Sequence, residues 1–170
     1  MSPHDPLVAL IRTTEGKVKG EREKLLARLL LEKAPPEDLQ NHPAEDLGQL
    51  VSGRMAFLAE RKPGRTKIAV TNPDGPFGAV TLVDILNDDM PFLVDSTISL
   101  LTERGYDVRL ALHPVLSVKR DGDGKLAALE AKPGSDAHTM RESFMHFHLA
   151  RINADEAWAL EEDLKAIFAD

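Results

Sequence analysis

The fold is decided by the stretch Asn87-Asp88-Asp89-Met90-Pro91-Phe92-Leu93-Val94-Asp95-Ser96. An apolar strand pattern at 79–86 leads into it, and a helical pattern at 93–101 leads out of it. Two carboxylates and an amide are therefore expected at a strand-to-helix turn. The helix N-terminus beside them offers free backbone N–H groups and the positive end of the helix dipole.

Three interpretations of this turn are open. In the first, Asp88 or Asp89 holds the ammonium group of a ligand while the free helix N–H groups receive its carboxylate. In the second, the acidic residues only cap the helix, which contributes about 0.5–2 kcal/mol to stability. In the third, the same surface contacts another domain. The candidate effector or interdomain site comprises Asn87, Asp88, Asp89, Met90, Pro91 and Phe92.

Upstream of this turn, residues 1–62 form a predicted helical leader. A leucine stripe at 25–30 lies among charged residues, which is typical of an amphipathic helix. Two prolines at 35–36 end that helix, and a second amphipathic helix is expected at 43–60. The basic link at 61–65 then ends the helical part of the chain.

Residues 66–170 form the predicted sheet domain. Turn residues at 72–76 return the chain, so that the strand at 67–71 lies antiparallel beside the strand at 79–86. Further strands are expected at 108–119, 125–131 and 143–152. Helices followed by a β-β-α-β-β-α order predict an α+β fold, in which an antiparallel sheet carries its helices on one face.

The last predicted helix follows a capping box, Asn153-Ala154-Asp155-Glu156. Its apolar stripe is expected to pack in the core, and some of it could face a missing domain. The stripe contains Trp158, Leu164, Ile167 and Phe168. The helix runs to Asp170 without a stop signal, so the chain is expected to be a fragment of a longer protein, truncated after its last helix.

Three histidines on predicted strands form the second candidate cluster. His113, His146 and His148 are expected to point to one face of the sheet, with Asp84 beside them. Imidazole and carboxylate groups are ligands for zinc and other divalent ions. The spacing does not itself predict a metal site, and the alternative is a polar face that is open or covered by a partner.

Composition excludes several function classes. The 170 residues carry a formal net charge of −7, which argues against nucleic-acid binding, because phosphate backbones attract basic faces. There is no cysteine, so disulfides and thiolate metal sites are excluded. The chain shows no signal peptide and no apolar run of the roughly 18 residues that a membrane helix needs. We therefore expect a cytoplasmic protein that binds neither nucleic acid nor membrane.

The run at 83–96 resembles the N-terminal region of the large bacterial NAD-specific glutamate dehydrogenases. Four further stretches match that region in the same order: Pro36 to Leu39, Glu60 to Gly64, Leu112 to Leu116, and Arg141 to His146. The region is similar to ACT domains, which are small sheet-and-helix (ferredoxin-like) modules that often bind amino acids and regulate metabolic enzymes. The resemblance implies a non-catalytic regulatory or assembly domain. Its parent enzyme would convert L-glutamate, NAD and water to 2-oxoglutarate, ammonia and NADH.

The residues agree that catalysis lies elsewhere in such an enzyme. No Gly-x-Gly-x-x-Gly motif follows any predicted strand, so this segment has no dinucleotide fingerprint. We expect no catalytic residue and no cofactor site here, and NAD would belong to the parent enzyme. The implied partners are other domains of the parent chain, a small amino-acid effector, and further copies in a homo-oligomer.

Two departures from the ACT pattern affect this interpretation. ACT domains commonly place glycine after the turn proline, where this chain has Phe92, whose ring is expected to fill the place that a ligand would use. The last ACT strand is also missing, and the strand at 67–71 is expected to replace it in a circularly permuted sheet. The alternatives are a pure interaction scaffold without a small-molecule ligand and a stand-alone sensor of amino acids or metals.

Overall fold

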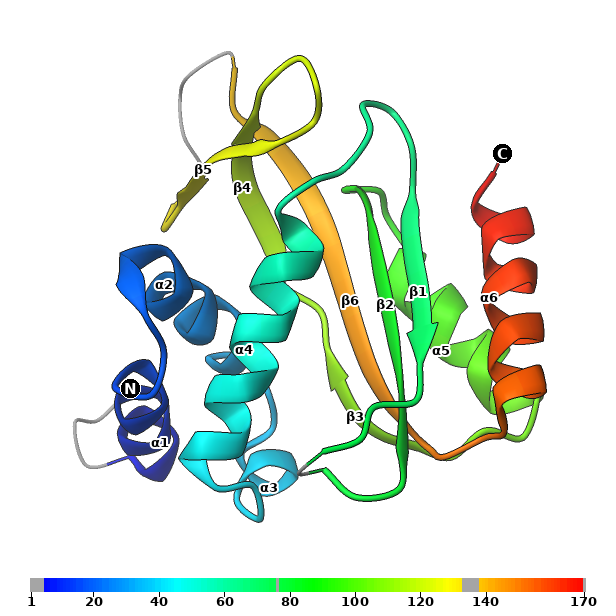
Figure 1. Cartoon of the computed structure of the whole chain (residues 1–170), viewed down its shortest axis with the longest axis horizontal. Helices are drawn as coiled ribbons and strands as arrows, with labels where there is room; N and C mark the ends of the chain where they lie inside the picture. Colours follow the sequence, from blue (N-terminus) through cyan, green and yellow to red (C-terminus); the bar gives the residue numbers. More distant parts are fainter. Residues whose placement is uncertain (1–4, 76, 133–137, 170) are drawn as a thin grey trace.

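The computed structural model describes residues 5–75, 77–132 and 138–169. Four helices come first: α1 (Pro6–Glu15), α2 (Gly20–Leu31), α3 (Pro36–Leu39) and α4 (Ala44–Leu58). They are followed by β1 (Lys67–Thr71), β2 (Val80–Asp88), α5 (Leu93–Glu103), β3 (Val108–Leu112), β4 (Val115–Arg120), β5 (Leu126–Glu130), β6 (Met140–Ala150) and α6 (Ala154–Phe168). This order confirms the predicted α+β class, with helices ahead of the strands (Figure 1).

The strands form one six-stranded sheet in which β6 is central. The order is β1-β2-β6-β4-β5, with β3 also paired to β6. All pairings among the described strands are antiparallel. As the sequence predicts, β1 lies antiparallel beside β2 at the edge of the sheet, with Lys67 opposite Leu86 and Thr71 opposite Leu82.

The strand predicted at 108–119 is in fact two strands, β3 and β4, which pair with the same side of β6. The break falls at His113 and Pro114, because proline has no backbone N–H to donate to the ladder. The carbonyl of Pro114 still accepts a hydrogen bond of 3.0 Å from the backbone N–H of Phe144. The two strands therefore follow one another along β6 without leaving the sheet.

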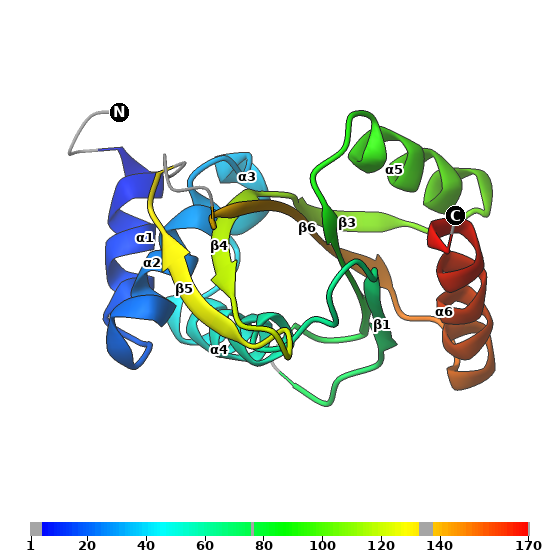
Figure 2. The same ribbon diagram turned by 90° about the horizontal axis from the view of Figure 1, so that it is seen from above.

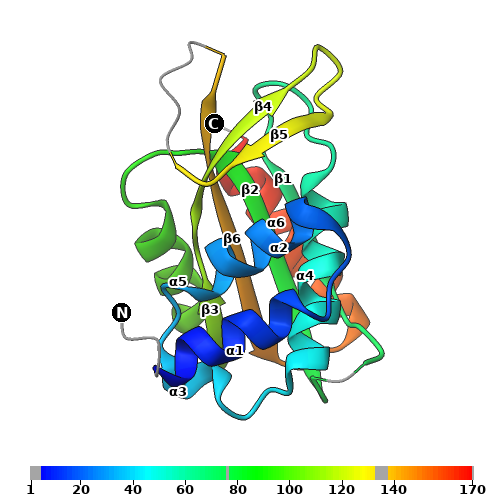
Figure 3. The ribbon, with the colours of Figure 1, turned by 90° about the vertical axis from the view of Figure 1, so that its left-hand side faces the viewer.

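Helices cover both faces of the sheet, as Figure 2 shows from above. Helices α5 and α6 lie on one face, in agreement with the predicted sheet domain, and the helices of the leader lie on the other. Figure 3 shows the leader side, where α1, α2 and α4 cross in front of the strands. The chain therefore has three layers, and its two cores lie on either side of the sheet.

The two cores draw on alternate residues of the same strands. Toward the leader, Leu86 and Phe144 pack with Leu26 and Leu47. The opposite core on the α5 and α6 side contains Val83, Ile85, Met145, Phe147, Leu149, Leu101, Leu160 and Leu164. Because both faces are covered, β2 is buried without interruption from Val80 to Leu86. This continuous burial leaves the polar side chains of Thr81 and Asp84 inside the protein.

Candidate functional site

The predicted turn is shorter than expected, because β2 continues to Asp88. Asn87 accepts a hydrogen bond of 3.0 Å from the Thr66 hydroxyl. The carboxylate of Asp88 lies 2.9 Å from Nη1 of Arg61, and that of Asp89 lies 3.6 Å from Nη2 of Arg141. Both acids are therefore paired with cations of this same chain.

Neither acid caps α5. The N-cap residue of this helix is Phe92, and no side chain forms a cap hydrogen bond there. The capping interpretation of the acidic residues is therefore wrong, because two further residues and the proline separate Asp89 from the first turn of the helix. The backbone places the acids back along the sheet, where Arg61 and Arg141 reach them.

Phe92 takes the backbone conformation of a glycine. Its φ is +68°, and no other non-glycine residue in the described part of the chain has a positive φ. The ring does not fill a ligand position, contrary to expectation, because its side chain points outward and is 77% exposed. A left-handed conformation at a bulky residue costs about 1–2 kcal/mol, so this turn is strained.

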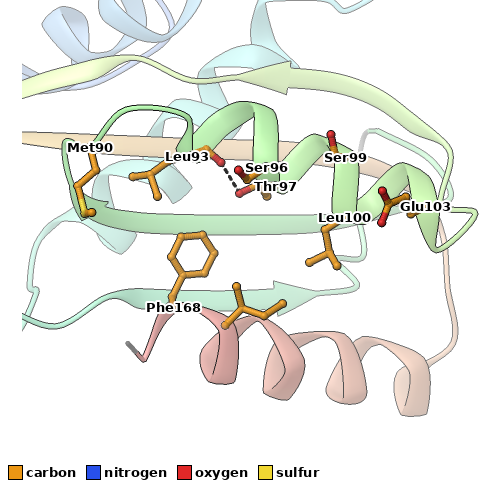
Figure 4. Close-up of a pocket in the computed structure, with 9 residues that line it drawn as sticks. Met90, Leu93, Ser96, Thr97, Ser99, Leu100, Glu103 and Phe168 are labelled. Carbon is orange, nitrogen blue, oxygen red and sulfur yellow. Dashed lines mark hydrogen bonds between the residues drawn. The ribbon is translucent and has the colours of Figure 1, made fainter.

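A groove lies next to the turn, between α5 and α6, with a cavity volume of about 420 Å³. Figure 4 shows Leu93 and Leu100 of α5 facing Phe168 of α6 across it. Of the six candidate residues only Met90 reaches the groove. The remaining lining residues are Ser96, Thr97, Ser99, Glu103 and Ile167.

The chemistry of this groove is mainly apolar. The Thr97 hydroxyl is already used, since it donates a hydrogen bond of 2.7 Å to the carbonyl of Leu93. Glu103 is the only ionisable residue that lines the groove within the described residues, so no cation is available there for the carboxylate of a free amino acid. The groove is therefore better suited to apolar side chains than to an amino-acid ligand.

Two large apolar side chains of α6 are exposed, and of these Ile167 lines the groove. Trp158 is 67% exposed and Ile167 is 51% exposed, although both were expected in the core. The buried face of α6 is instead made by Ala157, Leu160 and Leu164, at helical spacings of three and four. Trp158 directly follows Ala157, which rotates it about 100° away from the core.

The histidine cluster forms only in part, and it is closed to solvent. His146, His148 and Asp84 are buried on the face toward the leader. The predicted presence of His113 in this cluster is wrong, because Leu112 is the residue opposite His146 in the ladder. Cross-strand partners share a face, so His113 falls at the strand break, where it is exposed.

The leader covers this polar face with Arg54 of α4. Nδ1 of His146 lies 2.6 Å from the Asp84 carboxylate, and the Arg54 guanidinium lies 3.3 Å from the other oxygen of Asp84. Burial lowers the pKa of His148 to about 2, with further contributions from His146, His42 and Arg54. In the described ranges no group of three or more potential ligands converges as a metal site would require.

The described strands do not form the parallel sheet of a Rossmann dinucleotide-binding fold. A dinucleotide fold places the pyrophosphate at a glycine-rich turn between parallel strands, whereas the ladders here are antiparallel throughout the described sheet. Among the described residues, no helix is both long and apolar enough to pass through a lipid bilayer.

The fold and the groove together define the class of protein: an ACT-like α+β domain whose paired helices present an apolar groove. A family model described as "Glutamate dehydrogenase, ACT1 domain" matches residues 26–164. The chain therefore belongs to the family of ACT1 domains of glutamate dehydrogenases.

Two curated relatives agree with this assignment. The NAD-specific glutamate dehydrogenase of Halomonas elongata is 32% identical over 155 residues, which cover 85% of this chain and 10% of that protein. That of Pseudomonas aeruginosa is 33% identical over 139 residues, which cover 79% of this chain and 9% of that protein. The chain thus spans about a tenth of the length of these relatives, in their N-terminal region. No solved structure matches the chain.

Proposed function

We propose that this chain is the non-catalytic N-terminal module of a large NAD-dependent glutamate dehydrogenase, in which it serves assembly and regulation. The parent enzyme would convert L-glutamate, NAD and water to 2-oxoglutarate, ammonia and NADH, as a cytoplasmic homo-oligomer. The relatives that carry this segment are named NAD-specific glutamate dehydrogenases, which supports the parent activity.

The observation that carries the proposal is the uncovered apolar surface around the groove. Met90 and Ile167 line it, and they are 55% and 51% exposed. Contiguous exposed apolar surface marks interaction sites in otherwise polar proteins. The relatives continue for roughly nine times the matched length, so the occupant we propose for the groove is a later domain of the parent chain.

The amino-acid sensor is the second candidate, since Glu103 offers a carboxylate to an ammonium group at the end of an apolar groove. It lacks a cation for the other charge of the ligand. A thermal-stability screen of this chain against amino acids tests it, because a ligand at 100 times its dissociation constant adds about 2.7 kcal/mol. An increase that is lost in the E103Q variant would favour the sensor over the docking surface.

The docking proposal is tested in the full-length enzyme with Ile167→Glu. A charge placed in a buried apolar contact is strongly unfavourable, so we expect limited proteolysis after this segment to accelerate several-fold. The matched control is Met140→Glu at the start of β6, because Met140 is 43% exposed and lies outside the groove. Equal proteolysis of the two variants and the unmodified enzyme would show that the groove does not face another domain.

A further inference from the structure

The basic link between α4 and β1 is a built part of the structure. The backbone N–H of Arg61 donates to the carbonyl of Gly124 in the β4–β5 turn, at 2.9 Å. Gly124 lies so close that an added Cβ would stand 2.0 Å from the Arg61 carbonyl oxygen. Nε of Arg61 donates to the carbonyl of Arg65 at 2.6 Å, which closes the link on itself. These contacts fasten the link, which joins α4 to β1 in Figure 1, to the β4–β5 turn.

Arg61 itself is buried and only partly satisfied. It is 3% exposed, and its Nη1 contacts Asp88 and Glu142, each at 2.9 Å. The Glu142 carboxylate also accepts hydrogen bonds from Nε and Nη2 of Arg120, each at 2.9 Å. Nη2 of Arg61, however, has no hydrogen-bond partner among the described residues. A buried donor without a partner is unfavourable by about 1–3 kcal/mol. Because this nitrogen is closed to solvent, an anion outside would be attracted by the charge of Arg61 without hydrogen-bonding to Nη2.

Arg61 lines a hollow of about 510 Å³ that is strongly basic. Its lining consists of Glu60, Arg61, Lys62, Arg65, Thr66, Lys67 and Lys165. This concentration of positive charge contrasts with the formal charge of −7 on the whole chain. The side chains of Lys62 and Arg65 form no ion pair or hydrogen bond in the described part of the chain.

Lys67 shows that positive charge is crowded here. Its ammonium group donates to the carbonyls of Phe57 and Glu60, at 2.7 and 2.8 Å, which leaves one of its three donors. Burial and then the charge of Arg120 lower the pKa of Lys67. An anion in the hollow would relieve this repulsion, since opposite charge nearby favours the protonated form.

We propose that the hollow at 60–67 and Lys165 is a binding site for a small molecule that carries a phosphate group. Cations reach the hollow from the link and from α6, and a tetrahedral phosphate offers oxygens in several directions, whereas a carboxylate offers two in one plane. Lysine ammonium groups act as point charges suited to phosphate. The volume lies within the range of small-molecule pockets, about 300–1,000 Å³. This site is separate from the groove between α5 and α6, and the inference does not depend on the proposed function.

The test is calorimetric titration of the chain with pyrophosphate and with ADP at constant ionic strength. The test variant reverses both free cations, Lys62→Glu with Arg65→Glu. The matched control reverses Lys33 and Lys132 to Glu, two exposed lysines outside the hollow, so both variants change net charge equally. We expect the test variant to weaken binding at least about tenfold and the control less than about twofold, because charge interactions fall off within a Debye length of about 10 Å.

Comparison of the ligands identifies the anion. Tighter binding of ADP than of pyrophosphate would assign the site to a nucleotide, and the reverse would assign it to the phosphate groups alone. The proposal is overturned if neither binds at millimolar concentration or if both charge-reversal variants lose binding equally. It is also overturned if 2-oxoglutarate, a dicarboxylate, binds more tightly than both.

Discussion

The two faces of the sheet are held by different interactions. Toward the leader, the interface buries Arg54 with Asp84 and His146, and Arg61 and Arg120 with Glu142. Toward α5 and α6, the core cluster is apolar, and the buried Thr97 of α5 satisfies its hydroxyl within its own helix. The leader face therefore adds buried ion pairs to an apolar core, whereas the core on the opposite face is held by apolar packing.

This difference teaches what each face is suited to do. A buried ion pair adds little net stability, because desolvation offsets its attraction, but separating its partners is strongly unfavourable. The leader is thus fixed in one orientation on the sheet. The pair that links α5 to α6, Arg104 with Asp163, is exposed rather than buried. The groove between these helices stays uncovered, so this is the face suited to accepting a partner.

The largest expected effect comes from Glu142→Gln. Glu142 is fully buried and neutralises Arg61 and Arg120, so its loss leaves two buried guanidinium groups without their shared carboxylate. We expect the free energy of unfolding to fall by about 3–5 kcal/mol, measured by urea denaturation. The control is Glu162→Gln in α6, where an exposed pair with Lys165 predicts a loss below about 1 kcal/mol. Similar losses in the two variants would remove the distinction between the faces.

The second prediction is that the buried His148 lowers the stability of the protein at acidic pH. Its folded pKa of about 2 lies below the ordinary value of 6.5, so below pH 6.5 the unfolded chain takes up a proton that the folded chain refuses. Stability therefore falls as pH drops from 6.5 toward 2, by about 2 kcal/mol between pH 8 and pH 5. Urea denaturation at pH 8 and at pH 5 measures this fall in the free energy of unfolding. In H148L the fall should be smaller by about 2 kcal/mol.

The exposed His113 provides the control for this acid effect. H113L replaces a surface histidine in the strand break by the same residue, so only a change in pH dependence that H148L shows and H113L does not is assigned to the buried position. If H148L keeps the pH dependence of the unmodified chain, the acid sensitivity comes from other groups. The prediction for the leader face would then be wrong.

The sequence predicted the elements better than it predicted what covers them. The strand-to-helix junction at 87–96 and the pairing of β1 with β2 are readable, because turn residues and side-chain alternation are local signals. The second covered face was also signalled, by the nearly continuous apolar run at 80–86, which is typical of a strand buried on both sides. The amphipathic leader showed that it buries one face but not which surface receives it.

The sites show the same limit. Arg61 lies in a basic link that looks like surface, and its contact with Glu142 joins residues 81 positions apart, for which no local pattern exists. Trp158 misled for the opposite reason, since its size suggested the core, although helical spacing from Leu160 and Leu164 places it outside. Long-range pairing decides these positions, and periodicity alone does not report it.

The smallest expected effect concerns Phe92, the N-cap residue of α5 on the face opposite the leader. Phe92→Gly removes a left-handed strain of about 1–2 kcal/mol but gives the unfolded chain more freedom, which offsets about 0.4–1 kcal/mol. The net gain should lie between about 0 and 1.6 kcal/mol, seen as a small rise in melting temperature. Phe92→Ala keeps the Cβ and therefore the strain, and the exposed ring contributes little, so this variant should show no gain.

Equal melting temperatures for the two variants would mean that the turn is relaxed. A rise in the glycine variant alone would show that this chain keeps phenylalanine at a glycine-like position despite its strain, as expected of a side chain that contacts a partner outside the domain.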